Sequence, residues 1–409
     1  MPRRRRMPRA RRAAVLGAAI CALVLPAAAS DAARAVAHAD VADTHDGGAV
    51  RVVAGEDADR VAHARRLVAA MTVPERAASV VMAHTPTASP QTARAFMAET
   101  GVGGFIVMGA NVGGSAQELR SFAEALTVDA ALPPLVAVDQ EGGDVSRLPW
   151  DEFPSARTLK SAPPGAADEA FTGRGALVEG SGIGINFGVV ADYTDDPGSF
   201  IYHRALGTDP AGSAERVSAA VAGEARFAAS TLKHFPGHGA APGDSHVRIP
   251  SSDMTLAQWR ASEALPFAAG IDAGAPLVMF GHLAYTAVDD APASLSAAWH
   301  DILRGELGFT GVAITDDMAM LEASGLPRYQ DPVANAVRAL AAGNDVVLGV
   351  AYSTPQQART VVTGIADAVE ADELDAARLH EAAARAADLR LALGGAGGAA
   401  LCAGCEPVG

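Results

Sequence analysis

The chain has 409 residues, 49% of them hydrophobic, which is enough for one large domain or two to three smaller ones. Its formal charge is −15 at pH 7, although the first 30 residues carry seven arginines and no acidic residue. Without that segment the charge is −22, which argues against a protein that binds nucleic acid or anionic lipid through a basic surface.

The N-terminus has the pattern of a secretory signal peptide over residues 1–30. An arginine-rich head precedes an apolar run over residues 13–25 that is too short to span a membrane comfortably, and Ala27-Ala28-Ala29 fits a cleavage site. We therefore expect an exported protein. Lipoprotein signals usually place Gly or Ala before the lipidated cysteine, whereas Ile20 precedes Cys21, so lipid anchoring is the less favoured alternative.

Three further segments follow the signal. Residues 31–56 are rich in Ala and Asp and are predicted to form a disordered linker. A single catalytic domain is predicted over residues 57–395, and a C-terminal tail over residues 396–409. The tail contains Cys402 and Cys405, whose C-x-x-C spacing allows a local disulfide; with no second pair, we do not expect a zinc site there.

The predicted domain alternates between helical segments and short apolar runs. Helical spacing covers residues 57–71, and Thr72-Val73-Pro74-Glu75 has the pattern of a helix start. The apolar runs are residues 79–84, 104–108, 134–139, 185–192, 230–234, 276–282, 311–316 and 344–348. Predicted helices between or after them include residues 116–128, 211–228, 256–273, 294–307, 332–342 and 373–393.

Eight buried strands that alternate with helices predict an α/β protein with a parallel sheet. The number eight favours a (β/α)₈ TIM-type barrel over an open doubly wound sheet. No Gly-x-Gly-x-x-Gly turn or Walker loop follows a predicted strand, which argues against nucleotide binding. We predict no cofactor.

Polar residues stand at the carboxyl ends of five successive predicted strands. They are Asp139, Asp192, Lys233 with His234, His282 and Asp316. In a (β/α)₈ barrel these ends open into one mouth, where active sites are built. Arg204 follows the fourth strand and is expected to reach the same mouth.

The densest group of titratable residues is one loop. Lys233-His234-Phe235-Pro236-Gly237-His238-Gly239 is followed by Asp244-Ser245-His246, and the Gly and Pro content excludes a helix. An aspartate that accepts a hydrogen bond from one ring nitrogen fixes the tautomer of a histidine. The pair Asp244 and His246 therefore suits proton transfer near neutral pH.

The same loop allows two other readings. One is a surface loop with incidental histidines. The other is a metal site formed by His234, His238 and His246. Metal ligation is disfavoured because no His-x-x-x-His pair lies on a helix. We predict no metal site.

Two carboxylate motifs also end predicted strands. In Thr315-Asp316-Asp317-Met318, one Asp suits a nucleophile or a stabiliser of positive charge, while an Asp there can also cap the next helix. We expect Asp316 to be catalytic and Asp317 structural. Val138-Asp139-Gln140-Glu141 suits either bidentate contacts to vicinal hydroxyls or a turn with solvated charges.

Together these motifs closely resemble the signature of bacterial β-N-acetylglucosaminidases of glycoside hydrolase family 3. The resemblance covers about residues 66–348. Besides the loop, the matching motifs are Val138-Asp139-Gln140-Glu141-Gly142-Gly143 with Arg147-Leu148, Val190-Ala191-Asp192, Arg204 with Gly207 and Asp209-Pro210, Met279 with His282, Thr315-Asp316-Asp317-Met318, and Ala342-Gly343-Asn344-Asp345.

The resemblance implies a retaining, two-step hydrolysis of terminal β-linked N-acetylglucosamine. Asp316 would attack the anomeric carbon, and His246, paired with Asp244, would protonate the leaving oxygen and then activate water. The residues implied to form the sugar site are Asp139, Arg147, Asp192, Arg204, Lys233, His234 and His282.

The chain departs from the family pattern near the sugar site. It has Arg204-Ala205-Leu206-Gly207 where Arg-Ser-Phe-Gly is usual, Tyr202-His203 also differ, and Asp144 stands where a basic residue is common. These changes lie around the sugar site rather than on the reacting groups, so they leave the reaction class implied by the resemblance unchanged and the fine substrate preference open. About sixty residues follow the eighth strand, so we expect the acid/base to come from the barrel and not from a second domain.

Several function classes follow from these patterns. The preferred one is an exported exo-β-N-acetylglucosaminidase, monomeric, that acts on peptidoglycan fragments or chitooligosaccharides. A phosphorylase is an alternative, because a neutral histidine repels an incoming phosphate less than a carboxylate does. A broad β-glucosidase, a non-catalytic sugar-binding barrel and a metal hydrolase are the others.

Overall fold

The computed structural model describes residues 57–398, all of which lie within one compact unit, Gly48–Gly409. The predicted signal peptide, the predicted linker, and Cys402 with Cys405 lie outside the described residues. The helix that ends the described chain runs to Gly398, three residues beyond the predicted domain boundary.

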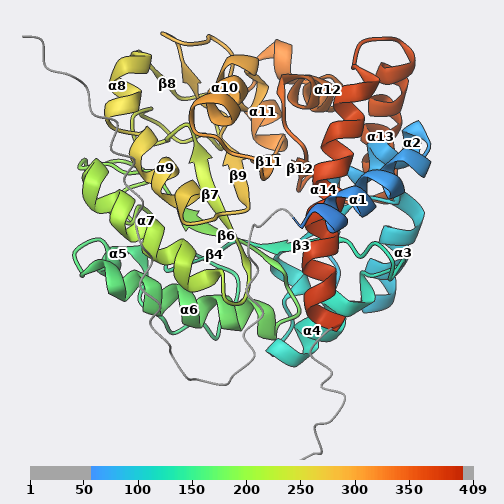
Figure 1. The fold of residues 1–409 in the computed structure, drawn as a ribbon, viewed down its shortest axis with the longest axis horizontal. Coiled ribbons are helices and arrows are strands. Elements are labelled where there is room, and N and C mark those ends of the chain that lie inside the picture. Colours follow the sequence, from blue (N-terminus) through green and yellow to red (C-terminus); the bar gives the residue numbers. More distant parts are fainter. Residues whose placement is uncertain (1–56, 399–409) are drawn as a thin grey trace, which may run out of the picture. The chain divides into compact units, whose positions relative to one another are not determined.

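Eight parallel strands form a nearly closed barrel in the order β11-β9-β7-β6-β3-β2-β1-β12 (Figure 1). They are β1 (Val81–Ala83), β2 (Gly104–Val107), β3 (Leu135–Val138), β6 (Ile185–Val190), β7 (Ala229–Phe235), β9 (Leu277–Phe280), β11 (Val312–Thr315) and β12 (Val347–Gly349). A parallel bridge between Ile314 and Val346 joins β11 to the chain entering β12. The predicted (β/α)₈ barrel is confirmed, and each predicted apolar run overlaps one strand.

Side chains of each strand alternate between the barrel interior and the helix layer. In β3, Leu135 and Ala137 belong to an apolar cluster to which all eight strands contribute, whereas Val136 and Val138 pack in a different cluster with helical residues. Both faces of the strands are therefore buried. This double burial explains why the strands appear in the sequence as continuous apolar runs.

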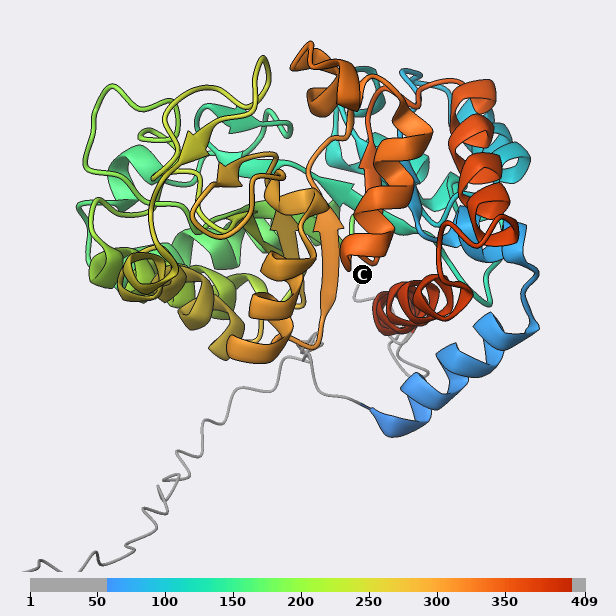
Figure 2. The ribbon, with the colours of Figure 1, turned by 90° about the horizontal axis from the view of Figure 1, so that it is seen from above.

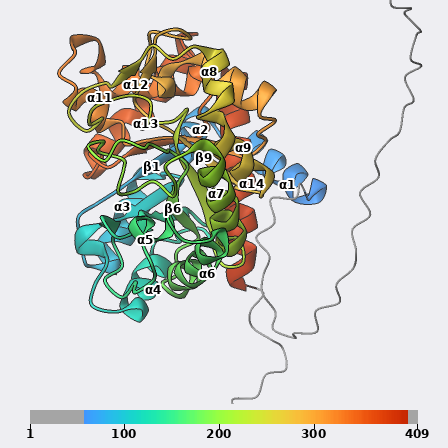
Figure 3. The same cartoon turned by 90° about the vertical axis from the view of Figure 1, so that its left-hand side faces the viewer.

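Helices surround the strands on the outside and at the amino-terminal end of the barrel. They are α1 (Ala58–Ala70), α2 (Val73–Ser79), α3 (Pro90–Thr100), α4 (Ala116–Ala125), α5 (Ala156–Leu159), α6 (Pro164–Gly180), α7 (Pro210–Glu224), α8 (Leu256–Ala261), α9 (Ala264–Asp272), α10 (Ala297–Asp301), α11 (Ala319–Ala323), α12 (Pro332–Ala342), α13 (Pro355–Glu370) and α14 (Ala376–Gly398). Figure 3 shows α6 and α7 side by side. None of the described helices is both long and apolar enough to cross a bilayer.

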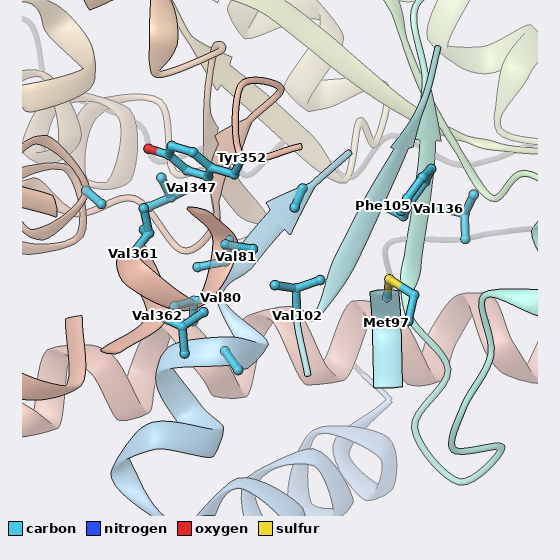
Figure 4. Packing of buried hydrophobic residues seen from close by; sticks show 14 of the residues in the cluster. Val80, Val81, Met97, Val102, Phe105, Val136, Val347, Tyr352, Val361 and Val362 are labelled. Atoms are coloured by element: carbon cyan, nitrogen blue, oxygen red, sulfur yellow. The ribbon is translucent and has the colours of Figure 1, made fainter. Parts of the chain in front are cut away.

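Apolar contacts fix the helices to the strands. Figure 4 shows Val81 of β1 and Phe105 of β2 in the same cluster as Met97 of α3 and Val361 of α13. Burying one such side chain stabilises the fold by about 1.5–3 kcal/mol. The cluster is therefore sufficient to hold α3 and α13 against this side of the barrel.

Helix α14 closes the amino-terminal end of the barrel. Its Ala386 and Leu389 belong to the interior cluster, together with side chains from the strands. In Figure 2 the strands of β9 and β11 point upward and α14 is seen almost end-on below them. The loops that follow the strands therefore lie at the opposite end, where the predicted site residues are.

Two predicted helices are interrupted in the structure. The segment 256–273 divides into α8 and α9 at Ser262, because Pro266 has no N–H for the Ser262 carbonyl and its ring would clash with it. The segment 294–307 has helix α10 only from Ala297, because the Ser296 hydroxyl accepts from the Trp299 N–H and caps a new helix, which then widens into the π-helical turn Ile302–Glu306.

Two short strand pairs at the carboxyl end of the barrel were not predicted. β4 (Gln140–Gly142) and β5 (Val145–Ser146) form an antiparallel hairpin directly after β3. β8 (Ser251–Ser252) and β10 (Ala284–Tyr285) pair in parallel. The hairpin matters for function because it places Glu141 and Arg147 beside the strand ends.

Candidate active site

The strand ends bring most of the predicted residues into one mouth. Lys233 Nζ in β7 lies 3.0 Å from Asp139 Oδ1, just after β3, although 94 positions separate them in the chain. Arg204, in the loop between β6 and α7, lies 3.3 Å from His234 Nε2 through its Nη2. Asp316 follows β11 and interacts electrostatically with His234 and Lys233.

A buried carboxylate, Glu141, lies between two cations. Its Oε1 is 2.8 Å from Lys233 Nζ and 2.7 Å from Arg204 Nη2, and its Oε2 accepts from Arg204 Nε at 2.9 Å. Burial opposes ionisation of Glu141, but Lys233 and Arg204 outweigh it and lower its pKa to about 2. Glu141 was not among the predicted site residues, although its motif was recognised.

Asp139 shares Lys233 with Glu141 but remains partly exposed. Asp139 is paired with Lys233 and, at 3.5 Å, with Arg147 Nη2. Its side chain is 17% exposed. Burial lowers the pKa of Lys233, but Glu141 and Asp139 outweigh that effect and raise it. Lys233 therefore remains protonated and can donate hydrogen bonds from its ammonium group.

Gln140 holds the β4–β5 hairpin in place from beneath. Its Oε1 accepts from the Arg147 N–H at 2.8 Å, and its Nε2 donates to Asp151 at 2.6 Å. Asp151 in turn forms a fully buried ion pair with Arg174 at 2.7 Å. Gly142 has φ +82°, and a Cβ there would lie 2.2 Å from the Arg174 guanidinium, so this turn requires glycine.

Asp192 lies behind His234 and does not face the opening. It is fully buried, accepts from His234 Nδ1 at 2.7 Å and from the His234 N–H at 3.1 Å, and also accepts from the His238 N–H at 2.6 Å. Both of its oxygens are therefore occupied by protein groups. The sequence predicts a sugar contact for Asp192, whereas these hydrogen bonds orient His234 so that its Nε2 faces Arg204.

His282 is also occupied by protein groups. It is fully buried, and its Nε2 donates to the Asp317 carbonyl at 3.0 Å, so its Nδ1 accepts from the Ser294 hydroxyl at 2.7 Å. Burial lowers the pKa of His282, against a smaller opposing effect of Asp316. The ring thus supports the backbone that carries Asp316, although the sequence predicts a sugar contact for it.

The two adjacent aspartates after β11 have different surroundings. Asp316 Oδ1 accepts the Asp317 N–H at 2.8 Å; burial raises its pKa, but His234 and His282 outweigh this and lower it. Asp317 Oδ1 accepts from the N–H groups of Val350 and Ala319, at 2.9 and 3.2 Å, and burial raises its pKa to about 6. The first carboxylate is available for chemistry, whereas the second joins α11 to the loop after β12.

Asp244 and His246 form a pair on an exposed loop. His246 Nδ1 is 2.6 Å from Asp244 Oδ1, and the His246 N–H donates to the same oxygen at 2.9 Å. The side chain of His246 is 60% exposed and that of Asp244 is 45% exposed. With Nδ1 held by the carboxylate, Nε2 is the nitrogen that can exchange a proton with a ligand.

Phe200 is a further residue of the mouth that the sequence reasoning missed. Its ring contacts those of His246 and His238, and the Arg204 guanidinium lies over it.

Burial lowers the pKa of His238 to about 4. In the described residues 57–398, no group of three or more His, Cys, Asp or Glu side chains could hold a metal ion.

Comparison with known proteins identifies the family. The family model described as the glycosyl hydrolase family 3 N-terminal domain matches residues 69–389. The chain belongs to glycosyl hydrolase family 3. It is therefore a glycoside hydrolase, and its substrate is a carbohydrate.

Named relatives and solved structures agree with this assignment. A β-hexosaminidase from Chromobacterium violaceum is 34% identical over 284 residues, 67% of this chain and 78% of that protein. The crystal structure of β-N-acetylhexosaminidase from Beutenbergia cavernae has 32% identity and a TM-score of 0.69, covering 78% of this chain and 98% of that one. A family 3 β-N-acetylglucosaminidase from Paenibacillus sp. has 29% identity and a TM-score of 0.74. The match covers 82% of this chain and 65% of that one.

Glu141 is predicted to make stability depend on acid pH. Its pKa of about 2 lies below the value of about 4.3 for an unfolded glutamate, so the stabilisation is complete above pH 4.3 and is lost as pH falls towards 2. Between pH 6 and 2, wild type should lose about 3 kcal/mol more unfolding free energy than Glu141→Gln, measured by urea denaturation. The exposed Glu373→Gln should follow wild type, and parallel curves for wild type and Glu141→Gln would contradict the prediction.

Proposed function

We propose that the protein is a retaining exo-β-N-acetylglucosaminidase that removes terminal β-linked N-acetylglucosamine. One observation carries the proposal: two kinds of titratable group meet at one mouth. The carboxylate of Asp316 has a lowered pKa, and a separate Asp244–His246 pair lies on the loop after β7. A nucleophile and a proton donor with different environments are what a double-displacement glycosidase needs. The β-hexosaminidase names of the relatives support the sugar specificity.

The charged cluster supports binding of the sugar hydroxyls. Lys233 and Arg204 are donors held in place by Glu141, so binding a sugar does not require them to be ordered first. Asp139 offers a carboxylate that accepts from hydroxyl groups, with Arg147 beside it. His234 contributes Nε2. We assign Asp192 and His282 as residues that position His234 and Asp316.

In the first step, Asp316 attacks the anomeric carbon. Its Oδ1 is held by the Asp317 N–H, so Oδ2 is the attacking oxygen. The C1–O bond of the leaving group breaks as His246 donates its Nε2 proton to that oxygen, which leaves a neutral ring with Nδ1–H bonded to Asp244. In the second step, Nε2 takes a proton from water, the water oxygen bonds to C1, and the bond to Asp316 breaks.

The loop that carries His246 is held at its start and, through the bond from the Ala284 N–H to the Pro250 carbonyl at 2.9 Å, at its end. Trp259 Nε1 donates to the Pro236 carbonyl at 2.7 Å, and the Tyr285 hydroxyl donates to the Gly237 carbonyl at 2.7 Å. These bonds, with that from the His238 N–H to Asp192, hold the start of the loop. We therefore assign the movement that brings His246 to the substrate to residues 240–249, which lie between these held ends.

Export, substrate source and oligomeric state complete the proposal. The signal-like residues 1–30 support export, which would expose the enzyme to peptidoglycan fragments or chitooligosaccharides. All the assigned site residues lie between Asp139 and Asp316 of one chain, which is compatible with action as a monomer.

Phosphorolysis is a second candidate, favoured by two features of the loop. A neutral His246 carries no negative charge that would repel phosphate. The exposed Arg248 packs its guanidinium against Gly243 and adds a positive charge near the pair. The product then distinguishes the two reactions.

Sugar specificity and the acceptor can be tested together. The protein should release p-nitrophenol from p-nitrophenyl N-acetyl-β-glucosaminide and yield free sugar at the same rate in phosphate and in a phosphate-free buffer. Turnover of the plain β-glucoside alone would contradict the specificity. Accumulation of sugar 1-phosphate would identify a phosphorylase, and tight sugar binding without turnover a binding protein.

The nucleophile can be trapped. A 5-fluoro derivative of the N-acetyl-β-glucosaminide with a good leaving group should leave a glycosyl adduct on the peptide that contains Asp316, found by mass spectrometry. Asp316→Ala should lower kcat by about 10⁴-fold or more, because no covalent intermediate can form. Asp317→Asn is the matched control and should still form the adduct; an adduct on any other residue would overturn the assignment.

Leaving-group dependence tests His246. His246→Ala should lower kcat/KM by about 10²–10⁴-fold for a substrate with an alkyl leaving group, which needs protonation. For a 2,4-dinitrophenyl leaving group, which departs without a proton, the loss should be much smaller. His203→Ala removes an exposed histidine near the mouth and should affect neither substrate. Equal losses on both substrates in His246→Ala would count against its role as the acid.

A further inference from the structure

Phe200 makes ring contacts with three groups of the mouth. Its ring centroid is 5.9 Å from that of His246, at an interplanar angle of 83°. It is 5.0 Å from the ring of His238, and the Arg204 guanidinium lies 5.3 Å from its centroid. One half-buried side chain therefore joins the loop of the proton donor to a cation of the sugar site.

The chain around Phe200 is firmly held. The neighbouring Ile201 is fully buried, and its carbonyl accepts from the N–H groups of Arg204 and Ala205 at 2.9 and 3.0 Å. Lys160 donates to the Tyr202 carbonyl and lies 3.9 Å above the Tyr202 ring. The backbone that follows Phe200 is thus held within its own loop and against Lys160, just after α5.

The other partners of the ring are also fixed. His238 is only 2% exposed, and its N–H donates to the buried Asp192 at 2.6 Å. Arg204 is paired through two nitrogens with Glu141. Phe200 therefore lies against Arg204 and the held start of the loop, and these contacts do not depend on residues 240–249.

His246, in contrast, is tied mainly to its own loop. Its ring and its backbone N–H both bond to Asp244, two residues away, and the Val247 N–H donates to the Asp244 carbonyl at 3.4 Å. These bonds orient the imidazole relative to the loop but not relative to Asp316. The edge-to-face contact with Phe200 supplies a reference point on the barrel.

We propose that Phe200 is a positioning residue for the proton donor, which holds the His246 ring at the edge of the sugar site and links it to Arg204. The inference rests on the proposed function, because it assigns a support to the acid/base of that reaction. An aliphatic side chain would fill the space without the T-shaped ring contact to His246 or a ring face for Arg204. A tyrosine would keep both.

A double-mutant cycle with two substrates tests this role. Phe200→Leu should lower kcat/KM by about tenfold for the alkyl N-acetyl-β-glucosaminide and by no more than about twofold for the 2,4-dinitrophenyl one, since only the former needs the proton. Phe200→Tyr should restore the wild-type ratio between the substrates. In a His246→Ala background, Phe200→Leu should cause no further loss on the alkyl substrate.

The control is Phe153→Leu, which changes a phenylalanine that packs against α6 and should leave the substrate ratio unchanged. Equal losses on both substrates in Phe200→Leu, or a loss that persists in the His246→Ala background, would overturn the positioning role while leaving the proposed function intact. Absence of wild-type turnover on either glucosaminide would overturn both.

Discussion

The buried ion cluster of Glu141, Lys233 and Arg204 is the interaction on which the mouth depends. Its three members come from the β4–β5 hairpin, strand β7 and the loop after β6, so the cluster ties three separate elements together. Removing one partner would leave an uncompensated buried charge, which typically costs about 3–5 kcal/mol. Because Glu141 holds both cations before a ligand arrives, Asp139 stays partly exposed beside Lys233 and Arg204 lies against His234, so the site is ordered in advance.

A contrast in rigidity accompanies this cluster. Lys233, His234 and Asp316 lie on or directly after barrel strands, and buried groups such as Asp192 and His282 hold them from behind. The Asp244–His246 pair is instead exposed and bonds mainly within its loop. Such a division suits a two-step glycosidase, in which the sugar and the nucleophile must stay aligned while the proton donor first gives and then takes a proton.

The barrel was predictable because its strands are buried on both faces and so appear as eight apolar runs. The helix breaks at Ser262 and Ser296 were not, since a periodic pattern extends across them; Pro266 was a local signal for the first. The positions of Asp192 and His282 at strand ends correctly predicted that they lie near the mouth. Such a position does not predict whether the side chain is available to a ligand or bonded to buried protein groups. Glu141 was missed because its role depends on Arg204, 63 positions away in the chain. Phe200 was missed because its role depends on the ring of His246, in the loop after the next barrel strand. No rule of local spacing connects either pair.

By itself, the sequence determined the number of barrel strands, their alternation with helices, the family resemblance and the residue types at each barrel-strand end. These follow from local periodicity and from motifs of adjacent residues. The tertiary structure alone decided which carboxylate each cation meets, which histidines are occupied by protein groups, and which aromatic ring lies against His246. Those outcomes depend on hydrogen bonds, ion pairs and ring contacts between segments that are distant in the chain, and they exist only once the barrel closes.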